Sequence, residues 1–347
     1  MKRTLAMLLA LVMMLGLMAG CGGEKAPEST APESQAPESQ APESEAPEAN
    51  DWAPEDDLVI YVGAGAGGDT DANARMLAEY LSEYAGINIA ITNVKGGSGL
   101  NAMEEVQGME PDGNTAFFGH TEALIPEIAD MCDYTFMDAF NIAGVCIKAN
   151  TTLLCIHKDN PNYQTLPELV EYAKAHPGEV EFANSTGGYP HLIGLALEEA
   201  AGIDMNFVEV GGNNDKKTAL AGQQTDVINI EYGIVKDYID SGEFLPIALL
   251  TEERNEQFPD IPTAKEQGVD LVMGKFFYLA FAKDVPAEVV SYYEKALEEI
   301  VANPDFIADC KATYFLDATY MNSADGMDYA NGVYEELNQF KEQFIAG

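Results

Sequence analysis

Short apolar runs of strand length alternate with amphipathic stretches of helical length from Leu58 to about Ala282. Apolar runs of about four to eight residues between turn residues predict buried strands, and apolar residues three and four positions apart predict helices. The predicted strands are Leu58–Val62, Ile87–Thr92, Thr115–Phe118, Asn141–Ile147, Thr152–Ile156, Val180–Ala183, Asn206–Val210, Asp226–Ile230, Leu245–Leu250 and Tyr278–Ala282. The predicted helices are Asp71–Tyr84, Leu166–His176, Pro190–Ala201 and Asp215–Ala221, and then Val289–Ala302, Asp305–Ala312 and Ala324–Ile345.

This alternation favours an α/β fold. Short apolar strands separated by helices are typical of parallel sheets that helices cover on both faces. The predicted strands are more numerous than those of one compact doubly wound sheet, so we expect two smaller sheets. The chain from Pro286 onward departs from the alternation, and its pattern predicts an almost wholly helical end.

The N-terminal residues follow a different pattern. Lys2 and Arg3 precede an apolar run from Leu5 to Met18, and small residues lead to Cys21. A basic start, a short apolar core and small exit residues describe a secretory signal over residues 1–20. Because a cysteine follows directly, the segment resembles the bacterial lipoprotein signal, in which this cysteine is lipidated and becomes the new N-terminus. An ordinary signal peptide and a short membrane anchor are the alternatives, but a span needs about twenty apolar residues.

Residues 26–50 contain five copies of a pentapeptide that begins Ala-Pro-Glu. The segment has no aliphatic residue larger than alanine, so it cannot bury enough apolar surface to offset the entropy of ordering. Proline in every copy and repeated glutamate stiffen and extend it. We therefore predict a disordered tether over residues 21–55, between the lipid and the folded part. An adhesive role is the alternative.

Four glycine-rich turns, at residues 65–71, 93–99, 184–191 and 210–214, each join a predicted strand to a predicted helix. Backbone N–H groups at a helix start lack intrahelical partners, and the helix dipole favours negative charge there. Ligands of open α/β sheets bind at the carboxyl ends of the strands. Four such turns therefore predict a shared anion-binding cleft.

The first of these turns also contains a dinucleotide-like motif. Gly63, Gly65 and Gly68 spell G-x-G-x-x-G after a strand. A dinucleotide site requires an acidic residue at the end of the second strand to hold the ribose, and Asn93 stands there. A predicted export signal also removes the chain from the cytoplasmic dinucleotide pool. Both observations count against NAD or FAD.

Composition limits the partners. The chain has 58 acidic and 18 basic residues, for a formal net charge of −40 at pH 7. Such a surface repels nucleic acid and anionic lipid, so local donors must capture any anion against the overall field.

Cysteine and histidine spacing does not indicate a metal or redox site. The cysteines after Cys21 form no C-x-x-C pair, which disfavours zinc and thioredoxin-like sites. Cys146 and Cys155 flank a predicted turn, so a hairpin disulfide is one interpretation and buried free thiols are the favoured one. No H-E-x-x-H occurs and the four histidines are widely scattered. No metal and no cofactor is expected.

Six motifs follow one another in the order found in a known family. They are Ala66–Arg75, Asn93–Gly99, Pro111–Thr115, Ser185–His191, Gly222–Val227 and Pro259–Thr263. With these motifs the chain resembles the solute receptors of tripartite tricarboxylate transporters, the Bug family of periplasmic binding proteins. Ala66 replaces the family's proline, Asp69 replaces its third glycine, and the fifth motif has one extra residue.

The resemblance implies a two-lobed Venus-flytrap fold of type II-like form with a helical C-terminal region. Lobe 1 would comprise residues 56–155 and 280–347, and lobe 2 residues 156–279. A small carboxylated metabolite would be captured between the lobes, outside the cytoplasm, for delivery to a membrane permease. The family's members are receptors and not enzymes.

The resemblance also implies a set of ligand-binding residues from both lobes. They are Gly67, Gly68, Asp69, Thr70, Asp71, Ser98, His120, Thr121, Ser185, Thr186, Gly187, Gly188, His191, Gly211, Gly212 and Glu231.

Several residues have a plainer alternative role. Asp69 or Thr70 would cap the following helix, Asp71 would stabilise its own turn, and His191 would bond to its own loop. The remaining expectations are structural roles for His120 and His157, a cation at a helix C-terminus for His176, and local pairing for Arg75.

The same residues also give an expectation for the charge of the ligand. Asp69 places an acid in the first turn, and the turn at residues 184–191 contains no lysine or arginine. We hypothesise a ligand of low negative charge, or one with an amine that Asp69 or Glu231 would meet. Tighter binding of a tricarboxylate than of monocarboxylates and amino acids would contradict this hypothesis.

An exported α/β enzyme, either a hydrolase or a dinucleotide-dependent enzyme, is the alternative function. Ser98 lies in Gly96-Gly97-Ser98-Gly99-Leu100, which lacks the final glycine of a nucleophile elbow. A hydrolase using His191 with Ser185 would turn over simple esters.

Overall fold

The computed structural model describes residues 52–346. The predicted signal peptide, the lipidation site Cys21 and most of the predicted tether over residues 21–55 lie outside the described residues and remain predictions. In the described part of the chain, no helix is both long enough and apolar enough to cross a membrane.

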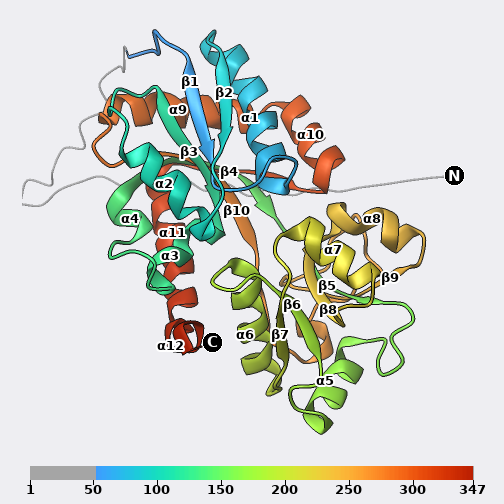
Figure 1. The fold of residues 1–347 in the computed structure, drawn as a ribbon. Coiled ribbons are helices and arrows are strands. Elements are labelled where there is room, and N and C mark those ends of the chain that lie inside the picture. The colour runs from blue at the N-terminus through green and yellow to red at the C-terminus, as the bar shows by residue number, and fades with distance from the viewer. Residues whose placement is uncertain (1–51, 347) are drawn as a thin grey trace, which may run out of the picture. The chain divides into compact units, whose positions relative to one another are not determined.

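The first sheet has six strands in the order β11-β4-β10-β3-β1-β2 (Figure 1). Its strands are β1 (Leu58–Val62), β2 (Ile89–Asn93), β3 (Thr115–His120), β4 (Phe140–Ala149), β10 (Lys275–Ala282) and β11 (Asp317–Met321). β1 is parallel to β2 and β3, whereas β10 is antiparallel to β3 and β4, and β11 is antiparallel to β4.

Helices cover both faces of this sheet. On one face Leu77, Leu297 and Phe306 belong to the same buried cluster as Ile60 and Phe118 of the sheet. The helices of that face are α1 (Asp69–Ala85), α9 (Ala287–Val301) and α10 (Pro304–Tyr314). The helices of the other face are α2 (Leu100–Gln107), α3 (Ile125–Ile128), α4 (Phe136–Ala139) and α11 (Ser323–Asn338).

The second sheet has five strands in the order β7-β6-β8-β5-β9. They are β5 (Thr152–His157), β6 (Glu181–Asn184), β7 (Asn206–Glu209), β8 (Val227–Glu231) and β9 (Phe244–Leu249). β6 is parallel to β7 and β8, and β5 is antiparallel to β8 and β9. One face is covered by α5 (Leu166–Ala175) and α6 (Tyr189–Ala201), the other by α7 (Asn213–Ala221) and α8 (Tyr232–Asp240).

The chain passes between the sheets at two places. It leaves the first sheet after Ala149 and enters the second at Thr152, and it returns between Leu249 and Lys275. The predicted lobe boundaries, after residues 155 and 279, fall inside β5 and β10. A third link is the C-terminal helix α12 (Lys341–Ala346), which contacts α6 of the second lobe.

The predicted α/β class with two sheets is confirmed, and a strand is present at each predicted position. The prediction of parallel sheets is wrong, because both sheets are mixed. Parallel neighbours require a helical crossover, but the chain enters β5 and β10 from the links between the lobes.

The C-terminal region contains two differences from the prediction. β11 lies between the predicted helices Asp305–Ala312 and Ala324–Ile345 and was not predicted, but it pairs with β4 through Asp317↔Lys148 and Ala318↔Ile147. Its strand state comes from this long-range pairing and has little local signal. The predicted helix Ala324–Ile345 is divided into α11 and α12, which begins at Lys341.

The cysteines of the folded part are free, as favoured from the sequence. Cys146 lies in β4 and Cys155 in β5, and both are buried free thiols. The alternative of a hairpin disulfide is wrong, because these strands belong to different sheets.

Candidate functional site

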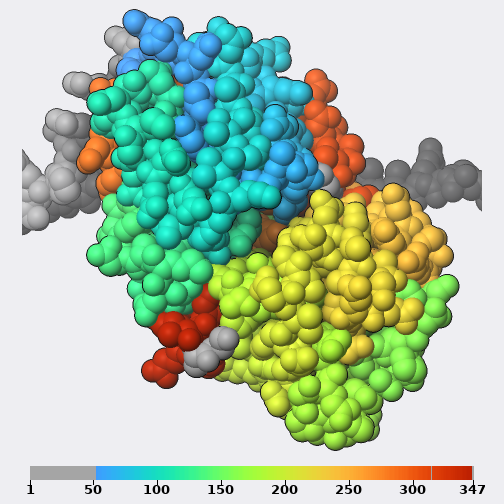
Figure 2. Space-filling view, in the orientation of Figure 1, coloured from blue at the N-terminus to red at the C-terminus, as the bar shows by residue number. Residues whose placement is uncertain are grey.

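The residues proposed for ligand binding lie mostly where strands end and helices begin. Gly67 and Gly68 lie in the β1–α1 connection, Asp69 to Asp71 form the first turn of α1, and His120 and Thr121 lie at the end of β3. Ser185 to Gly188 connect β6 to α6, Gly211 and Gly212 connect β7 to α7, and Glu231 ends β8. The surfaces of the two lobes meet in Figure 2, where blue and cyan atoms of the first lie against yellow-green atoms of the second.

Asp71 organises the first turn. Its Oδ2 accepts a hydrogen bond of 2.8 Å from the amide of Gly67, which has φ of +79°. Arg75 donates to the same carboxylate, and so does Asn93, whose Nδ2 lies 3.0 Å from Oδ1. Although burial alone would raise the pKa of Asp71, these donors lower it. The turn-stabilising role of Asp71 and the local pairing of Arg75 are therefore confirmed.

The capping alternative for Asp69 and Thr70 is wrong. α1 begins at Asp69 itself, its N-cap is Gly68, and no side chain caps it. Asn93, which stands where a dinucleotide site needs an acid, donates to the carbonyl of Ala64 as well as to Asp71.

The amides of the third and fourth turns are already paired within the second lobe. The amide of Thr186 donates to Glu209 at 2.6 Å, and that of Gly188 to the carbonyl of Ser185 at 2.9 Å. Gly211 and Gly212 donate to the Asn184 carbonyl and to Asp215. The expectation that these turns offer free N–H groups is wrong at these positions, because neighbouring acceptors occupy them.

His191 is buried and packs against rings from two elements. It lies between Phe207, with ring centroids 5.2 Å apart, and Phe344 of α12, at 4.8 Å. Its Nδ1 accepts from the amide of Gly187 at 3.5 Å. The contact with its own loop, the alternative to a ligand contact, is therefore present.

His120 and Thr121 bond mainly to their neighbours in the first lobe. Nδ1 of His120 accepts from the amide of Glu122, and its Nε2 lies 3.4 Å from the Glu122 carboxylate. Thr121 Oγ1 donates to the carbonyl of Gly274 and accepts from the amide of Phe276. Thr121 thereby fixes the segment through which the chain returns from the second lobe.

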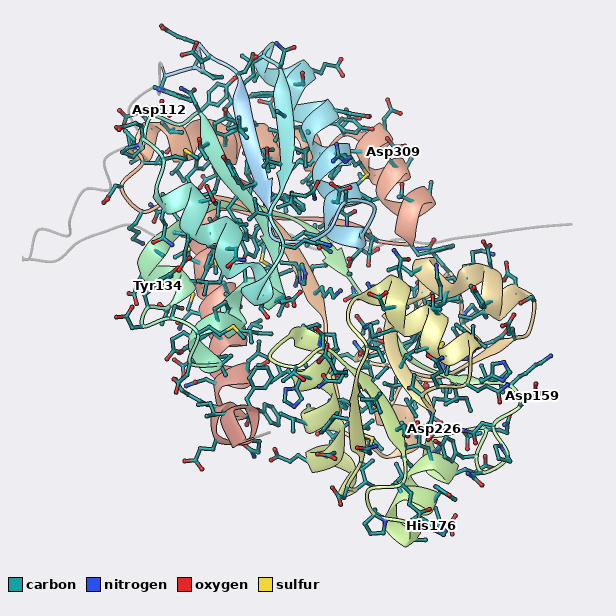
Figure 3. All side chains as sticks on the ribbon, in the orientation of Figure 1. Asp112, Tyr134, Asp159, His176, Asp226 and Asp309 are labelled. Carbon is teal, nitrogen blue, oxygen red and sulfur yellow. The ribbon has the colours of Figure 1, made fainter. Side chains whose placement is uncertain are left out.

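The other two histidines lie away from the interlobe face. His157 Nδ1 accepts from the amide of Asp159, so the structural role predicted for it is confirmed. His176 is the C-cap of α5 and lies at the far end of the second lobe (Figure 3). Across residues 52–346, no group of three His, Cys, Asp or Glu side chains is arranged to hold a metal.

Several contacts join the two lobes at the turns. Ser98, which has φ of +54°, donates from Oγ to the carbonyl of Gly187 at 2.8 Å. Gly187 has φ of +77°, which favours glycine where the lobes approach, and a Cβ there would lie 2.7 Å from Cε of Met131, the end of a flexible side chain that would have to move. Glu122 Oε1 lies 3.1 Å from the Cβ position of Gly188, at the start of α6. The second turn, at residues 93–99, therefore contacts the third, whereas the resemblance implied that the first and third turns face each other.

The central residue of this interface is Lys275, which the sequence analysis missed. Its Nζ lies 3.0 Å from Asp69 of the first lobe and forms a second ion pair with Glu231 of the second. Only 8% of the Lys275 side chain and 4% of that of Glu231 are exposed. The second carboxylate oxygen of Glu231 accepts from Asn213 at 3.0 Å.

Opposite charges, and not exposure, keep this cluster ionised. Burial raises the pKa of Asp69, but the adjacent Lys275 overcomes this and lowers it to about 2. Burial lowers the pKa of Lys275, but Asp69 and Glu231 together raise it above its ordinary value. The amine that Asp69 and Glu231 meet in this structure is thus the chain's own lysine.

A second buried lysine lies beside this cluster. Lys216 of α7 is 1% exposed, and its Nζ donates to the carbonyl oxygen of Asn229 at 2.6 Å. Burial lowers the pKa of Lys216 to about 8, although the charge of Glu231 opposes the shift.

A small cavity of about 20 Å³ lies on the first-lobe side of the interface. Thr70, Ser98, His120 and Glu122 contribute to its lining. Thr70 is 2% exposed, and its Oγ1 has no hydrogen-bond partner among the described residues. Because about 10–15 Å³ of such space holds one water, this cavity has room for one water and not for a metabolite.

Comparisons with known proteins agree with this architecture. A family profile described as "Tripartite tricarboxylate transporter family receptor" matches residues 73–343. The Cupriavidus necator "UPF0065 protein in gbd 5'region" is 26% identical over 285 residues, which cover 80% of this chain and 84% of that protein.

Solved structures show the same fold. The R. palustris protein Rpa4515 with adipate superposes with a TM-score of 0.73 at 22% identity, over 83% of this chain and 98% of the other. MatC from Rhodopseudomonas palustris with bound malate gives a TM-score of 0.72 at 21% identity, over 84% and 99%. Because the family profile covers most of the folded part, this chain belongs to the tripartite tricarboxylate transporter receptor family.

Proposed function

We propose that this chain is an extracytoplasmic solute-binding receptor, which captures a small carboxylate between its lobes and delivers it to permease subunits in the membrane. Membership of the receptor family supports this role, and two proteins of the same fold carry malate and adipate, both carboxylates. The observation that carries the proposal is Lys275, a buried cation placed where the two lobes meet.

Lys275 is suited to bind a carboxylate. A primary ammonium has three N–H donors, and Asp69 and Glu231 account for two of them. The third would remain for the ligand. Thr70 Oγ1, buried and unpaired among the described residues, would supply a neutral donor on the residue that follows Asp69. The other residues implied by the family resemblance complete the proposed site around these two.

Binding requires the lobes to separate and close. The lobes touch through Ser98 and Gly187, and the cavity on the first-lobe side of this contact holds about one water. A ligand therefore enters when the lobes are apart. Closure then removes water, which strengthens the attraction between Lys275 and the carboxylate. The closed surface is what a permease would recognise.

The N-terminal segment is proposed to hold this receptor at the membrane. Residues 1–20 would be removed, Cys21 would be lipidated, and the tether would extend from the lipid. Replacement of Cys21 by serine is expected to release the receptor from the membrane fraction, as measured by fractionation of cells that express either form.

Mass spectrometry of small molecules released from purified, denatured protein tests the function. A carboxylated metabolite in the eluate supports the proposal, and a nucleotide would reverse it. The receptor should also return its ligand unchanged. Conversion of the recovered molecule on incubation with fresh protein would instead support the enzyme alternative.

A further inference from the structure

The charged side chains at the interface are unequal in number. There are three carboxylates, on Asp69, Glu122 and Glu231, and two lysines, Lys216 and Lys275. These side chains are close together, because the charges of the three carboxylates and of Lys275 all affect the pKa of Lys216. The group is buried or half-buried, so water screens these charges less than at a surface. A ligand that adds only negative charge would increase the imbalance.

The two lysines do not neutralise all three carboxylates. Lys216 is directed at Asn229 and stays within the second lobe. Lys275 is shared between Asp69 and Glu231, and Asn213 holds the far oxygen of Glu231.

Glu122 is the acid that has no lysine in direct contact. Its partner is the imidazole of His120, and about a third of its side chain is exposed (32%). Glu122 belongs to the short helix η2 (Thr121–Leu124) on the first lobe, and it reaches the start of α6 on the second. It is therefore the carboxylate most available to a ligand between the lobes.

The cavity next to Glu122 contains an unsatisfied polar group. Thr70 Oγ1 is buried without a partner among the described residues, and Thr70 and Glu122 line the same cavity. An unpaired buried hydroxyl is costly. The combination of this hydroxyl with the partly exposed carboxylate of Glu122 indicates that a polar ligand group belongs here.

Building on the proposed function, we propose that the ligand carries an amine next to its carboxylate, and that Glu122 and Asp69 receive the ammonium while Lys275 receives the carboxylate. A zwitterionic α-amino acid has this arrangement. Its ammonium would face Glu122 and Asp69, and its carboxylate would face Lys275. Each charge of the ligand would therefore lie beside an opposite charge of the chain. A carboxylate without an amine would instead face Glu122 and Asp69 uncompensated.

Matched pairs of probes test the inference. Aspartate with succinate, glutamate with glutarate, alanine with propionate, and leucine with 4-methylpentanoate differ only in the amine. Affinities are measured by calorimetry on the folded chain. In at least one pair the amino acid should bind about tenfold or more tightly than its partner, the effect expected of one charge-assisted hydrogen bond.

Glu122→Gln then separates recognition of charge from a structural role. The variant should lose about tenfold in affinity for the amino acid, while its affinity for the amine-free partner should rise. Two opposite changes are not expected from misfolding. Glu105→Gln is the matched control, because Glu105 is an exposed acid on α2 of the same lobe, and it should change neither affinity.

Equal or tighter binding of the amine-free partners overturns the inference and leaves the carboxylate function intact. Absence of binding across the panel also overturns it, since the panel contains the proposed class. In that case the released-ligand measurement still decides the carboxylate function separately. An unchanged affinity pattern in Glu122→Gln would equally contradict the assignment of Glu122.

Discussion

Two lysines are buried side by side in this protein with opposite results. Lys275 contacts two carboxylates, Asp69 and Glu231, and its pKa is raised. Lys216 contacts only the neutral oxygens of Asn229, and its pKa is lowered to about 8. Burial penalises the charged form of both. Only a paired carboxylate reverses that penalty.

The two lysines also differ in what they connect. Lys275 begins β10 in the first sheet and reaches both Asp69 on the first lobe and Glu231 on the second. Lys216 and Asn229 both belong to the second lobe. Charge is therefore retained where the lobes meet and a carboxylate would bind. Within the second lobe, Lys216 has no carboxylate in direct contact, so its charged form is less favoured and its ammonium donates to the Asn229 carbonyl.

The largest expected effect comes from removing Lys275. Lys275→Met leaves Asp69 and Glu231 buried without their cation, so the free energy of unfolding should fall by about 3–5 kcal/mol. Urea denaturation at pH 7 measures it. The triple variant Lys275→Met, Asp69→Asn, Glu231→Gln should regain most of the loss, because it leaves no unpaired charge. An equally unstable triple variant would show that packing, and not charge, causes the loss.

Lys216 should produce a rise in stability at alkaline pH. Its folded-state pKa is about 8, below the value of about 10.4 in an unfolded chain. The unfolded state therefore binds more protons between these values, and stability should rise with pH by up to about 3 kcal/mol from this group. Denaturation midpoints between pH 7.5 and 10.5 measure the rise.

The Lys216→Met variant should flatten that rise. Lys275 cannot cause this rise, because its pKa is raised in the folded state, so its stabilisation is fully present below the unfolded value of about 10.4 and only decreases at higher pH. An alkaline rise that persists in Lys216→Met would assign the effect to another group.

Asp69 should contribute to the loss of stability at acid pH. Its folded-state pKa of about 2 lies below the unfolded value of about 3.9, so it stabilises the fold above about pH 4, and this is lost as pH falls toward 2. The loss from this group is about 2 to 3 kcal/mol. The Asp69→Asn variant should be less stable than wild type at pH 7, and its free energy of unfolding should fall less steeply as pH is lowered from 4 to 2. An equally steep fall in the variant and in wild type would contradict the pairing of Asp69 with Lys275.

The smallest effect is expected at Ser98. Its bond to the carbonyl of Gly187 joins the lobes directly, but it is a neutral contact worth about 1 kcal/mol. Ser98→Ala should reduce the free energy of unfolding by about that amount, measured by urea denaturation. A loss as large as that of Lys275→Met would mean that the turns, and not the charges, hold the lobes together.

The sequence predicted much of the fold because its signals are local. β1, at Leu58–Val62, was located to the residue from an apolar run followed by glycines. β11 was missed because its five residues are only half-buried and depend on pairing with β4. The antiparallel entry of β10 was also missed, since it depends on the path of the chain through the second lobe.

The sequence predicted the position of the site from its glycine-rich turns, but it did not predict the ion pairs within the site. Glycines after strands showed where the lobes converge, and Asp69 and Glu231 were among the predicted residues. Their partner Lys275 lies 206 residues from Asp69 and precedes the predicted strand at Tyr278. No local pattern connects them. The pairing of the turn amides could not be predicted either, because acceptors such as Glu209 of β7 come from other elements of the fold.

The most direct test compares the two lysines by the ligand that each variant retains. Wild type, Lys275→Met and Lys216→Met are purified identically, and the carboxylate released on denaturation is quantified per mole of protein by mass spectrometry. We predict a bound carboxylate in wild type and in Lys216→Met, and its loss from folded Lys275→Met. A Lys275→Met protein that retains the wild-type amount would contradict the account.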